Sequence, residues 1–164
     1  MFGISPIGWL HTLGSLPALA VAIYMLARHG RIVPHSKPGM VYLLSMLLGG
    51  ATAFLVAKQS VSYVIGGLTL VVILFGYTAD RLTFLGGLRR YLETASLSFS
   101  LLLLLLPTVT ETLTRVPDGA PLAAGPTAPL VLGAHGALVI GFVILLAAQM
   151  IGLRRAGRGA AVQA

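Results

Sequence analysis

The sequence contains no cysteine. This excludes a disulfide framework, a thiolate metal site and a cysteine nucleophile. Charge is also scarce, because only 9% of the 164 residues are Asp, Glu, Lys or Arg, whereas soluble domains carry roughly 25%. So few charged residues cannot cover the surface of a soluble domain of this length. Since 57% of the residues are hydrophobic, the composition indicates a membrane protein.

The common motifs of soluble enzymes are missing as well. There is no P-loop, no GxGxxG after a strand, no HExxH and no GxSxG. No Lys or Arg precedes Arg28, so the positively charged start of a signal peptide is lacking, and we expect an uncleaved first span. The formal net charge of +7 does not indicate nucleic-acid binding, because the basic residues separate apolar runs instead of forming a patch.

Long apolar runs dominate the chain. A helix needs about 20 mostly apolar residues to cross a bilayer. The segments that meet this need are 8–27, 39–57, 61–79, 92–112 and 130–153. They predict an all-α, polytopic transmembrane bundle of about five spans that forms one domain over residues 1–153. The basic tail, 154–164, is expected to be cytoplasmic and without regular structure.

The distribution of Lys and Arg predicts the orientation. With the first loop in the cytoplasm, nine basic residues fall on the cytoplasmic side and only Lys58 and Arg115 on the other. The nine are Arg28, Arg31, Lys37, Arg81, Arg89, Arg90, Arg154, Arg155 and Arg158. By the positive-inside rule, the N-terminus is outside and the C-terminus is cytoplasmic. The expected location is the bacterial inner membrane.

The candidate ligand-binding residues share the outer side of this topology. They are His11, Tyr63, Glu111, Arg115 and His135. Ionisable groups within a membrane are functional candidates because burying them is costly. Four of them also have a structural interpretation. His11 can meet headgroups, Glu111 and Arg115 can pair at i and i+4, and His135 can hydrogen-bond a neighbouring helix.

Two classes of function remain open. In the first, an outer-leaflet site binds a ligand. Two histidines could hold a b-type haem, or His11, His135 and Glu111 a divalent metal, or the same groups could relay protons or hold a quinone headgroup. In the second, the protein is a structural or accessory membrane subunit, or a small dimeric transporter. No catalytic residues are predicted. The expected partners are the lipid bilayer and a second copy or another membrane subunit.

Small residues at four-residue spacing predict how helices pack. Such faces occur in the first, second and fifth spans, as Gly14/Ala18/Ala22, Ser45/Gly49/Ala53 and Gly133/Ala137/Gly141. In lipid, small faces let helices approach closely, so we expect these three spans to contact one another. Glu93 is expected to pair with Arg89 or Arg90. Trp9, Tyr24, Tyr42, Tyr77 and Tyr91 are expected to form an interfacial belt.

Three pieces of the chain carry a family resemblance. They are GWLHTLGSLPAL (8–19), HGRIVPHSKPGMVYLLSM (29–46) and RRYLETASLSFSLLLLLLPTVTETLTRVPDGAPL (89–122). Together they resemble small bacterial integral membrane proteins of unknown function, the nearest group being the predicted membrane proteins filed as domain of unknown function 2306. The resemblance covers most of the chain. It implies a bacterial inner-membrane protein and implies no activity.

Overall fold

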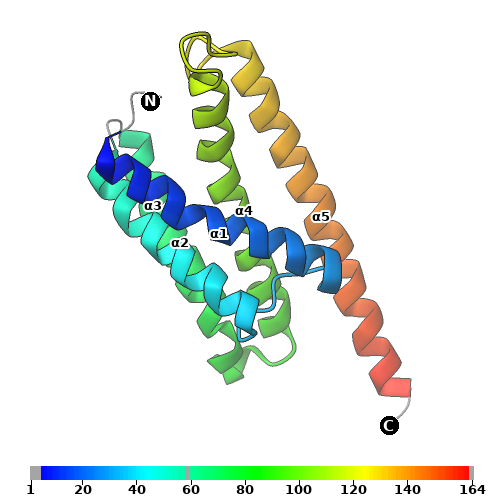
Figure 1. The fold of residues 1–164 in the computed structure, drawn as a ribbon. Coiled ribbons are helices and arrows are strands. Elements are labelled where there is room, and N and C mark those ends of the chain that lie inside the picture. The colour runs from blue at the N-terminus through cyan, green and yellow to red at the C-terminus, as the bar shows by residue number, and fades with distance from the viewer. Residues whose placement is uncertain (1–4, 58–59, 163–164) are drawn as a thin grey trace.

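The computed structural model describes residues 5–57 and 60–162, and their side chains as far as residue 157. Within these residues all regular structure is helical (Figure 1). The long helices are α1 (Pro6–His29), α2 (Lys37–Val56), α3 (Ser60–Thr78), α4 (Leu88–Arg115) and α5 (Pro129–Val162), and two 3₁₀ turns, η1 (Ala79–Arg81) and η2 (Thr83–Leu85), precede α4. The predicted all-α class is confirmed. Five helices are long and apolar enough to cross a membrane, as a multi-pass membrane protein requires.

Capping residues determine where the first two helices begin and where α1 ends. Ser5 and Ser36 are the N-caps of α1 and α2, and their hydroxyls accept hydrogen bonds from the N–H groups of Gly8 and Gly39, both at 3.1 Å. Gly30 ends α1 with φ of 68°, a left-handed conformation that glycine adopts without strain. These polar end turns explain why both helices begin before the expected apolar spans.

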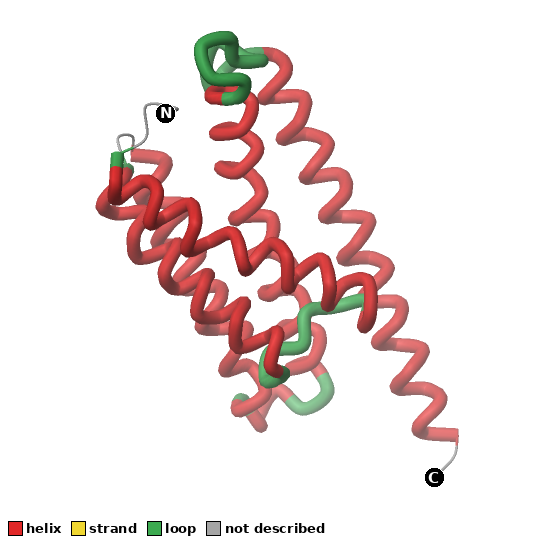
Figure 2. Tube along the Cα trace, viewed as in Figure 1, coloured by secondary structure: helices red, strands yellow, loops and turns green. Residues whose placement is uncertain are grey.

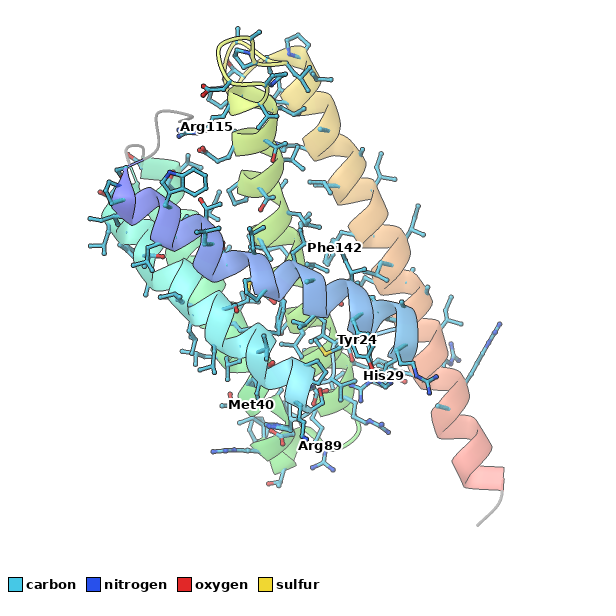
Figure 3. All side chains as sticks on the ribbon, in the orientation of Figure 1. Tyr24, His29, Met40, Arg89, Arg115 and Phe142 are labelled. Carbon is cyan, nitrogen blue, oxygen red and sulfur yellow. The ribbon has the colours of Figure 1, made fainter. Side chains whose placement is uncertain are left out.

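Successive helices run in opposite directions, so their connections gather at two ends of the bundle (Figures 1 and 2). We call the end that holds residues 30–36, residues 79–87 and the C-terminal part of α5 the basic end. The opposite end holds the start of α1, the end of α2, the start of α3 and the loop 116–128. Figure 3 shows His29 and Arg89 at the basic end and Arg115 at the opposite end.

Packing follows the order of the chain. The most extensive helix contacts are between consecutive helices: α1 with α2, α2 with α3, α3 with α4, and α4 with α5. The buried apolar core lies toward the basic end. It consists of Ala18, Ala22, Met25, Ile32, Tyr42, Met46, Ile73, Tyr77, Leu97 and Leu101. The bundle is therefore closed toward its basic end.

The predicted small-residue contact between α1 and α2 is present. A Cβ atom placed on Gly14 would lie 2.5 Å from Leu48 Cδ2, and one placed on Gly49 would lie 3.1 Å from Ser15 Cβ. The same expectation is wrong for α5. A Cβ atom on Gly133 or Gly141 meets nothing within 4 Å, because α5 packs mainly on α4 through its other face.

Much of the helical surface is apolar and exposed. On α5 the exposed residues include Leu132, Ile140, Val143 and Ile144, each more than half exposed. A soluble monomer rarely exposes contiguous apolar surface of this kind, whereas a bilayer would cover it. α5 also continues through the basic tail to Val162, so the tail, expected to lack regular structure, is helical over most of its length.

Candidate functional site

A cavity of about 520 Å³ lies in the half of the bundle farther from the basic end. Its lining comes from four segments: 5–19 on and before α1, 46–57 at the end of α2, 62–69 near the start of α3, and 103–115 at the end of α4. In each of the four helices, these residues belong to the half that is farther from the basic end. None of the described residues of α5 contributes. The bundle is thus packed toward one end and hollow toward the other.

The polarity of the lining changes along the cavity. Toward the middle of the bundle it is mainly apolar, with Leu16, Leu19, Met46, Leu103 and Leu104. Toward the helix ends it carries His11, Thr12, Ser62, Glu111, Thr112 and Arg115. An apolar interior with a few polar groups at one place is the usual character of a small-molecule site.

His11 is held in one orientation by Thr52 of α2. The imidazole Nδ1 lies 3.0 Å from Thr52 Oγ1. That hydroxyl lies 2.6 Å from the Leu48 carbonyl oxygen and donates its proton there. Since a hydroxyl has one proton, Thr52 Oγ1 accepts from His11 Nδ1–H. In the neutral imidazole, Nε2 then carries the lone pair and can accept a hydrogen bond from a ligand.

Glu111 and Arg115 form the predicted pair across one turn of α4. Arg115 Nε donates to Glu111 Oε2, and both side chains line the cavity. Glu111 also lies within electrostatic range of His11. The structure therefore brings together three of the five candidate residues, two from α4 and one from α1.

The threonines near the end of α4 follow Pro107, which cannot donate a backbone hydrogen bond. Thr108 and Thr112 line the cavity, and their hydroxyls donate to the carbonyl oxygens of Leu104 and Thr108 at 2.7 Å and 2.8 Å. These hydroxyls satisfy backbone carbonyls within the helix. Their oxygen lone pairs can still accept hydrogen bonds from inside the cavity.

His135 follows the structural alternative, a hydrogen bond to a neighbouring helix. Its Nε2 lies 3.1 Å from the Leu106 carbonyl oxygen and 2.9 Å from Thr110 Oγ1. A carbonyl only accepts hydrogen bonds, so Nε2 carries the proton and donates it to α4. His135 does not belong to the described lining of the cavity. The expectation that it meets His11 and Glu111 in one pocket is wrong, because its imidazole holds α5 against α4.

Tyr63 is also outside the cavity lining as described. Its hydroxyl donates to the Ala57 carbonyl oxygen at 3.4 Å, and its ring centroid lies 6.0 Å from that of Phe54. These contacts join the start of α3 to the end of α2. Tyr63 therefore has a structural explanation.

The donor set does not favour haem or a divalent metal. Protein zinc sites use three or four protein ligands, and no group of three or more His, Asp or Glu side chains suited to a metal occurs in residues 5–57 and 60–162. A haem held by His11 and His135 would need both imidazoles at one cavity. His11 lines the cavity, whereas His135 Nε2 is bonded to α4.

Polar contacts that the sequence did not reveal stabilise the basic end. Glu93 accepts a hydrogen bond from Arg31 Nη1 at 2.8 Å, not from Arg89 or Arg90 as expected. Tyr42 and Tyr77 are buried instead of interfacial. Their hydroxyls bond with Ser100 Oγ at 2.8 Å and with the Gly39 carbonyl oxygen, respectively.

Gln149 adds a further link at this end. It accepts from Ser98 Oγ at 2.7 Å and donates to the Gly30 carbonyl oxygen at 3.0 Å. An amide inside an apolar run needs hydrogen-bond partners in a membrane, and this signal could have identified Gln149 from the sequence. Its partners lie 51 and 119 residues away, and no local pattern indicates them.

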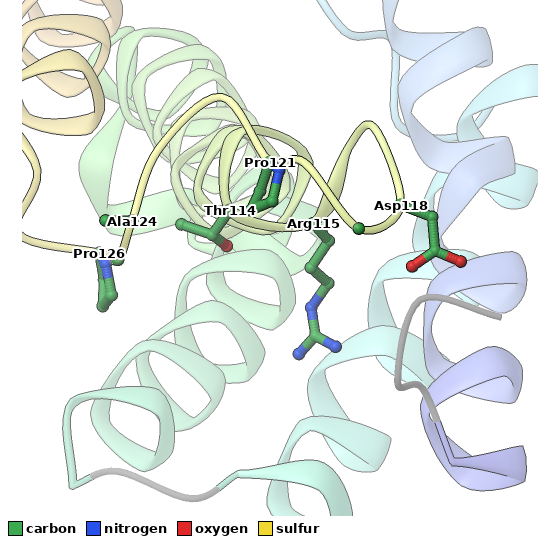
Figure 4. A pocket seen from close by; sticks show the side chains of 8 residues that line it. Thr114, Arg115, Asp118, Pro121, Ala124 and Pro126 are labelled. Atoms are coloured by element: carbon green, nitrogen blue, oxygen red, sulfur yellow. The ribbon is translucent and has the colours of Figure 1, made fainter.

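A second hollow, of about 420 Å³, lies under the loop 116–128. It is lined by Thr114, Arg115, Asp118, Gly119, Pro121, Ala124, Gly125 and Pro126 (Figure 4). Arg115 is common to both hollows. Figure 4 shows its side chain extending from α4 away from the loop, toward the helices α1 to α3. The guanidinium therefore lies where the larger cavity meets the loop.

Comparison with known proteins finds no family model, no curated protein and no solved structure that matches this chain. The resemblance to the group of domain of unknown function 2306 stays a prediction.

Proposed function

We propose that this protein is a multi-pass protein of the bacterial inner membrane that binds a small amphiphilic ligand in the outer-leaflet half of its bundle. The observation that carries the proposal is the cavity of about 520 Å³, in which His11, Glu111 and Arg115 lie above an apolar interior. Ligand sites commonly have volumes of roughly 300–1,000 Å³. The cavity is large enough to hold a small amphiphile or part of a larger one.

The charge distribution supports the orientation. Nine of the eleven Lys and Arg residues lie at or near the basic end, which by the positive-inside rule faces the cytoplasm. The cavity then lies in the outer half of the bundle. Along α4 it runs from Leu103 to Arg115, which is about 18 Å at 1.5 Å per residue. This is a little more than half of a hydrocarbon core of about 30 Å, so the cavity occupies mainly one leaflet.

The shape and polarity select the kind of ligand. The cavity has a modest volume but extends along α4, so it is narrow. A narrow apolar space suits an apolar chain. The polar groups at its mouth suit a head that both donates and accepts hydrogen bonds, because His11 Nε2 and Glu111 accept while Arg115 donates. Quinols and lipids both have this character.

The test is ligand retention by the purified protein, measured by native mass spectrometry in detergent. The probes are a polar lipid extract of the host membrane and, separately, a short-chain ubiquinol. Thr108→Phe places a ring inside the cavity, since Thr108 lines it. Val64→Phe adds similar bulk to α3 at a position that is 65% exposed and outside the described lining.

We expect one bound ligand on the wild type and on Val64→Phe, and its loss from Thr108→Phe. Equal retention by all three proteins, or no retention by any, would contradict the proposal. Thermal unfolding of each variant shows that a loss of ligand does not reflect a loss of fold.

An accessory role is the second candidate, and one observation favours it. A Cβ atom added to Gly133, Gly136 or Gly141 of α5 would have no neighbouring atom within 4 Å. Glycine-rich faces in membranes allow close approach of another helix. A second copy or a partner subunit would explain the face. Chemical cross-linking in native membranes, compared between wild type and Gly136→Leu, tests this role independently of ligand binding.

A further inference from the structure

We propose that residues 79–90, which comprise η1, η2 and the first residues of α4, bind anionic phospholipids of the leaflet at the basic end. We call these residues the α3–α4 segment. Phe84 lies among the lipid headgroups, and Arg81 and Arg90 contact lipid phosphates. The segment is at the other end of the bundle from the cavity, so this inference does not depend on the proposed ligand.

The length of α3 places the segment at the membrane surface. α3 has 19 residues, which corresponds to about 28 Å at 1.5 Å per residue. A hydrocarbon core is about 30 Å thick, so α3 is just long enough to cross it. The residues that follow Thr78 then reach the headgroups, before α4 returns the chain to the core.

The segment carries apolar side chains that the bundle does not cover. Phe84 is 81% exposed, more than any other large hydrophobic side chain in the described residues, and Leu88 is 54% exposed. The other connection at this end is different, because Ile32 is only 1% exposed and belongs to the core. The first connection thus turns its isoleucine toward the bundle, whereas the α3–α4 segment turns Phe84 away from it.

Hydrogen bonds hold the segment in one shape. The N–H group of Gly86 donates to the Thr83 carbonyl oxygen at 3.1 Å, and Arg89 Nη1 donates to the Asp80 carbonyl oxygen at 3.4 Å. The Asp80 carboxylate also lies 3.3 Å from His35 Nε2, in the connection between α1 and α2. Phe84 is therefore presented on a turn that the protein itself stabilises.

The charges of the basic end favour an anionic partner. Of the four acidic residues in the whole chain, only Asp80 and Glu93 lie at this end, where they face nine Lys and Arg residues. Both acids already have a basic partner. Arg81 and Arg90 are exposed and form no ion pair within the part of the chain that the structure describes. Their charges are available to an external anion.

The combination of exposed apolar and basic side chains selects lipid as this anion. Membrane-surface segments join Phe or Leu side chains to Lys or Arg, and basic residues beside a bilayer attract anionic lipids. A guanidinium can form two parallel hydrogen bonds with a phosphate. A second copy of the chain is disfavoured, because two such segments would bring their arginines together. An acidic protein would match the charge as well, but lipid already surrounds the segment at this level.

The first measurement locates residue 84 relative to the bilayer. Trp9 is the only tryptophan of the chain, so Trp9→Phe combined with Phe84→Trp gives a single fluorescent reporter. The protein is reconstituted into vesicles of phosphatidylcholine and phosphatidylglycerol whose acyl chains carry bromine either near the headgroup or near the chain end. Ile144→Trp in the same Trp9→Phe background is the depth control, since Ile144 is 64% exposed in the apolar part of α5.

We expect the tryptophan at position 84 to be quenched mainly by bromine near the headgroup, and the one at position 144 mainly by bromine near the chain end. Absence of quenching at position 84 would show that this residue faces water, as in a docking site for a soluble protein, and would overturn the inference. Stronger quenching there by bromine near the chain end would also overturn it.

The second measurement tests the choice of lipid. Protein in detergent is mixed with equal amounts of phosphatidylglycerol and phosphatidylcholine with identical chains, and the bound lipids are resolved by native mass spectrometry. The test variant combines Arg81→Gln with Arg90→Gln. The matched control combines Arg154→Gln with Arg155→Gln, which removes two charges from the same end of the bundle, but on α5. Thermal unfolding checks that each variant is folded.

We expect the wild type and the control to prefer phosphatidylglycerol by about fivefold or more, the fold-change that one arginine at an anionic surface contributes. The test variant should show a preference of about twofold or less. Equal losses in both variants would mean that total charge, and not this segment, selects the lipid. That result, no loss in either variant, or no preference in the wild type overturns the inference and leaves the proposed function of the cavity unaffected.

Discussion

Arg31 and Glu93 are joined by a hydrogen-bonded ion pair, with Nη1 of the arginine 2.8 Å from Oε1 of the glutamate. They are 62 residues apart in the chain. Arg31 lies in the connection after α1 and Glu93 in α4. The carboxyl side chain is only 11% exposed. The pair therefore fixes the first connection to the buried side of α4, at the end of the bundle where the core is most completely packed.

Removing the carboxylate of Glu93 should destabilise the fold. We expect Glu93→Ala to lower the free energy of unfolding by about 1–3 kcal/mol, because a mostly buried guanidinium loses its charged partner. Thermal unfolding in detergent measures this. Arg90→Ala is the control, since Arg90 is exposed. Equal effects of the two substitutions would show that the pair contributes little.

The close approach of α1 and α2 at Gly49 predicts a contrast between two glycines. Gly49→Leu should cost about 1–3 kcal/mol, because its side chain would press on Ser15 and separate the helices. Gly141→Leu should leave the stability close to that of the wild type, since nothing lies within 4 Å of its Cβ position. Melting temperatures of the two variants, prepared in the same detergent, test the contrast. A larger loss for Gly141→Leu would contradict the packing of α5.

We expect substitution of His135 to affect mainly stability and substitution of His11 to affect mainly ligand retention. His135→Ala removes the hydrogen bonds from α5 to Leu106 and Thr110, and we expect a loss of about 1 kcal/mol with the ligand retained. His11→Ala should leave the melting temperature nearly unchanged, because Thr52 keeps its bond to Leu48. It should reduce retention of the ligand in native mass spectrometry. The opposite pattern would place the ligand against His135.

The orientation can be read with reporter fusions. Alkaline phosphatase is active only outside the cytoplasm, so a fusion after Ala124, in the loop 116–128, should be active. A fusion after Gly157, near the end of α5, should be inactive. The expected result follows from the bias of basic residues toward the other end of the bundle. Activity only in the second fusion would reverse the topology.

Several features of the fold were predictable because they depend on neighbours in the chain. Apolar runs of sufficient length identify helices in a membrane, and serine, proline and glycine mark their ends. The pairing of Glu111 with Arg115 was predictable for the same reason, since one helical turn brings them together. The contact of α1 with α2 was predictable from their small residues, although the similar face of α5 has no such neighbour.

The sequence by itself determined the solvent class of the protein, its helices and the candidate residues, because hydrophobicity, capping and helical spacing are local properties. Only the tertiary structure decided the partners across helices. It placed His11 with Glu111 at one cavity, bonded His135 to α4, and paired Glu93 with Arg31. Each of these contacts depends on which helices are neighbours and which of their faces meet. In an apolar medium many pairings bury similar side chains, so the choice is made by shape and by hydrogen bonds between distant segments.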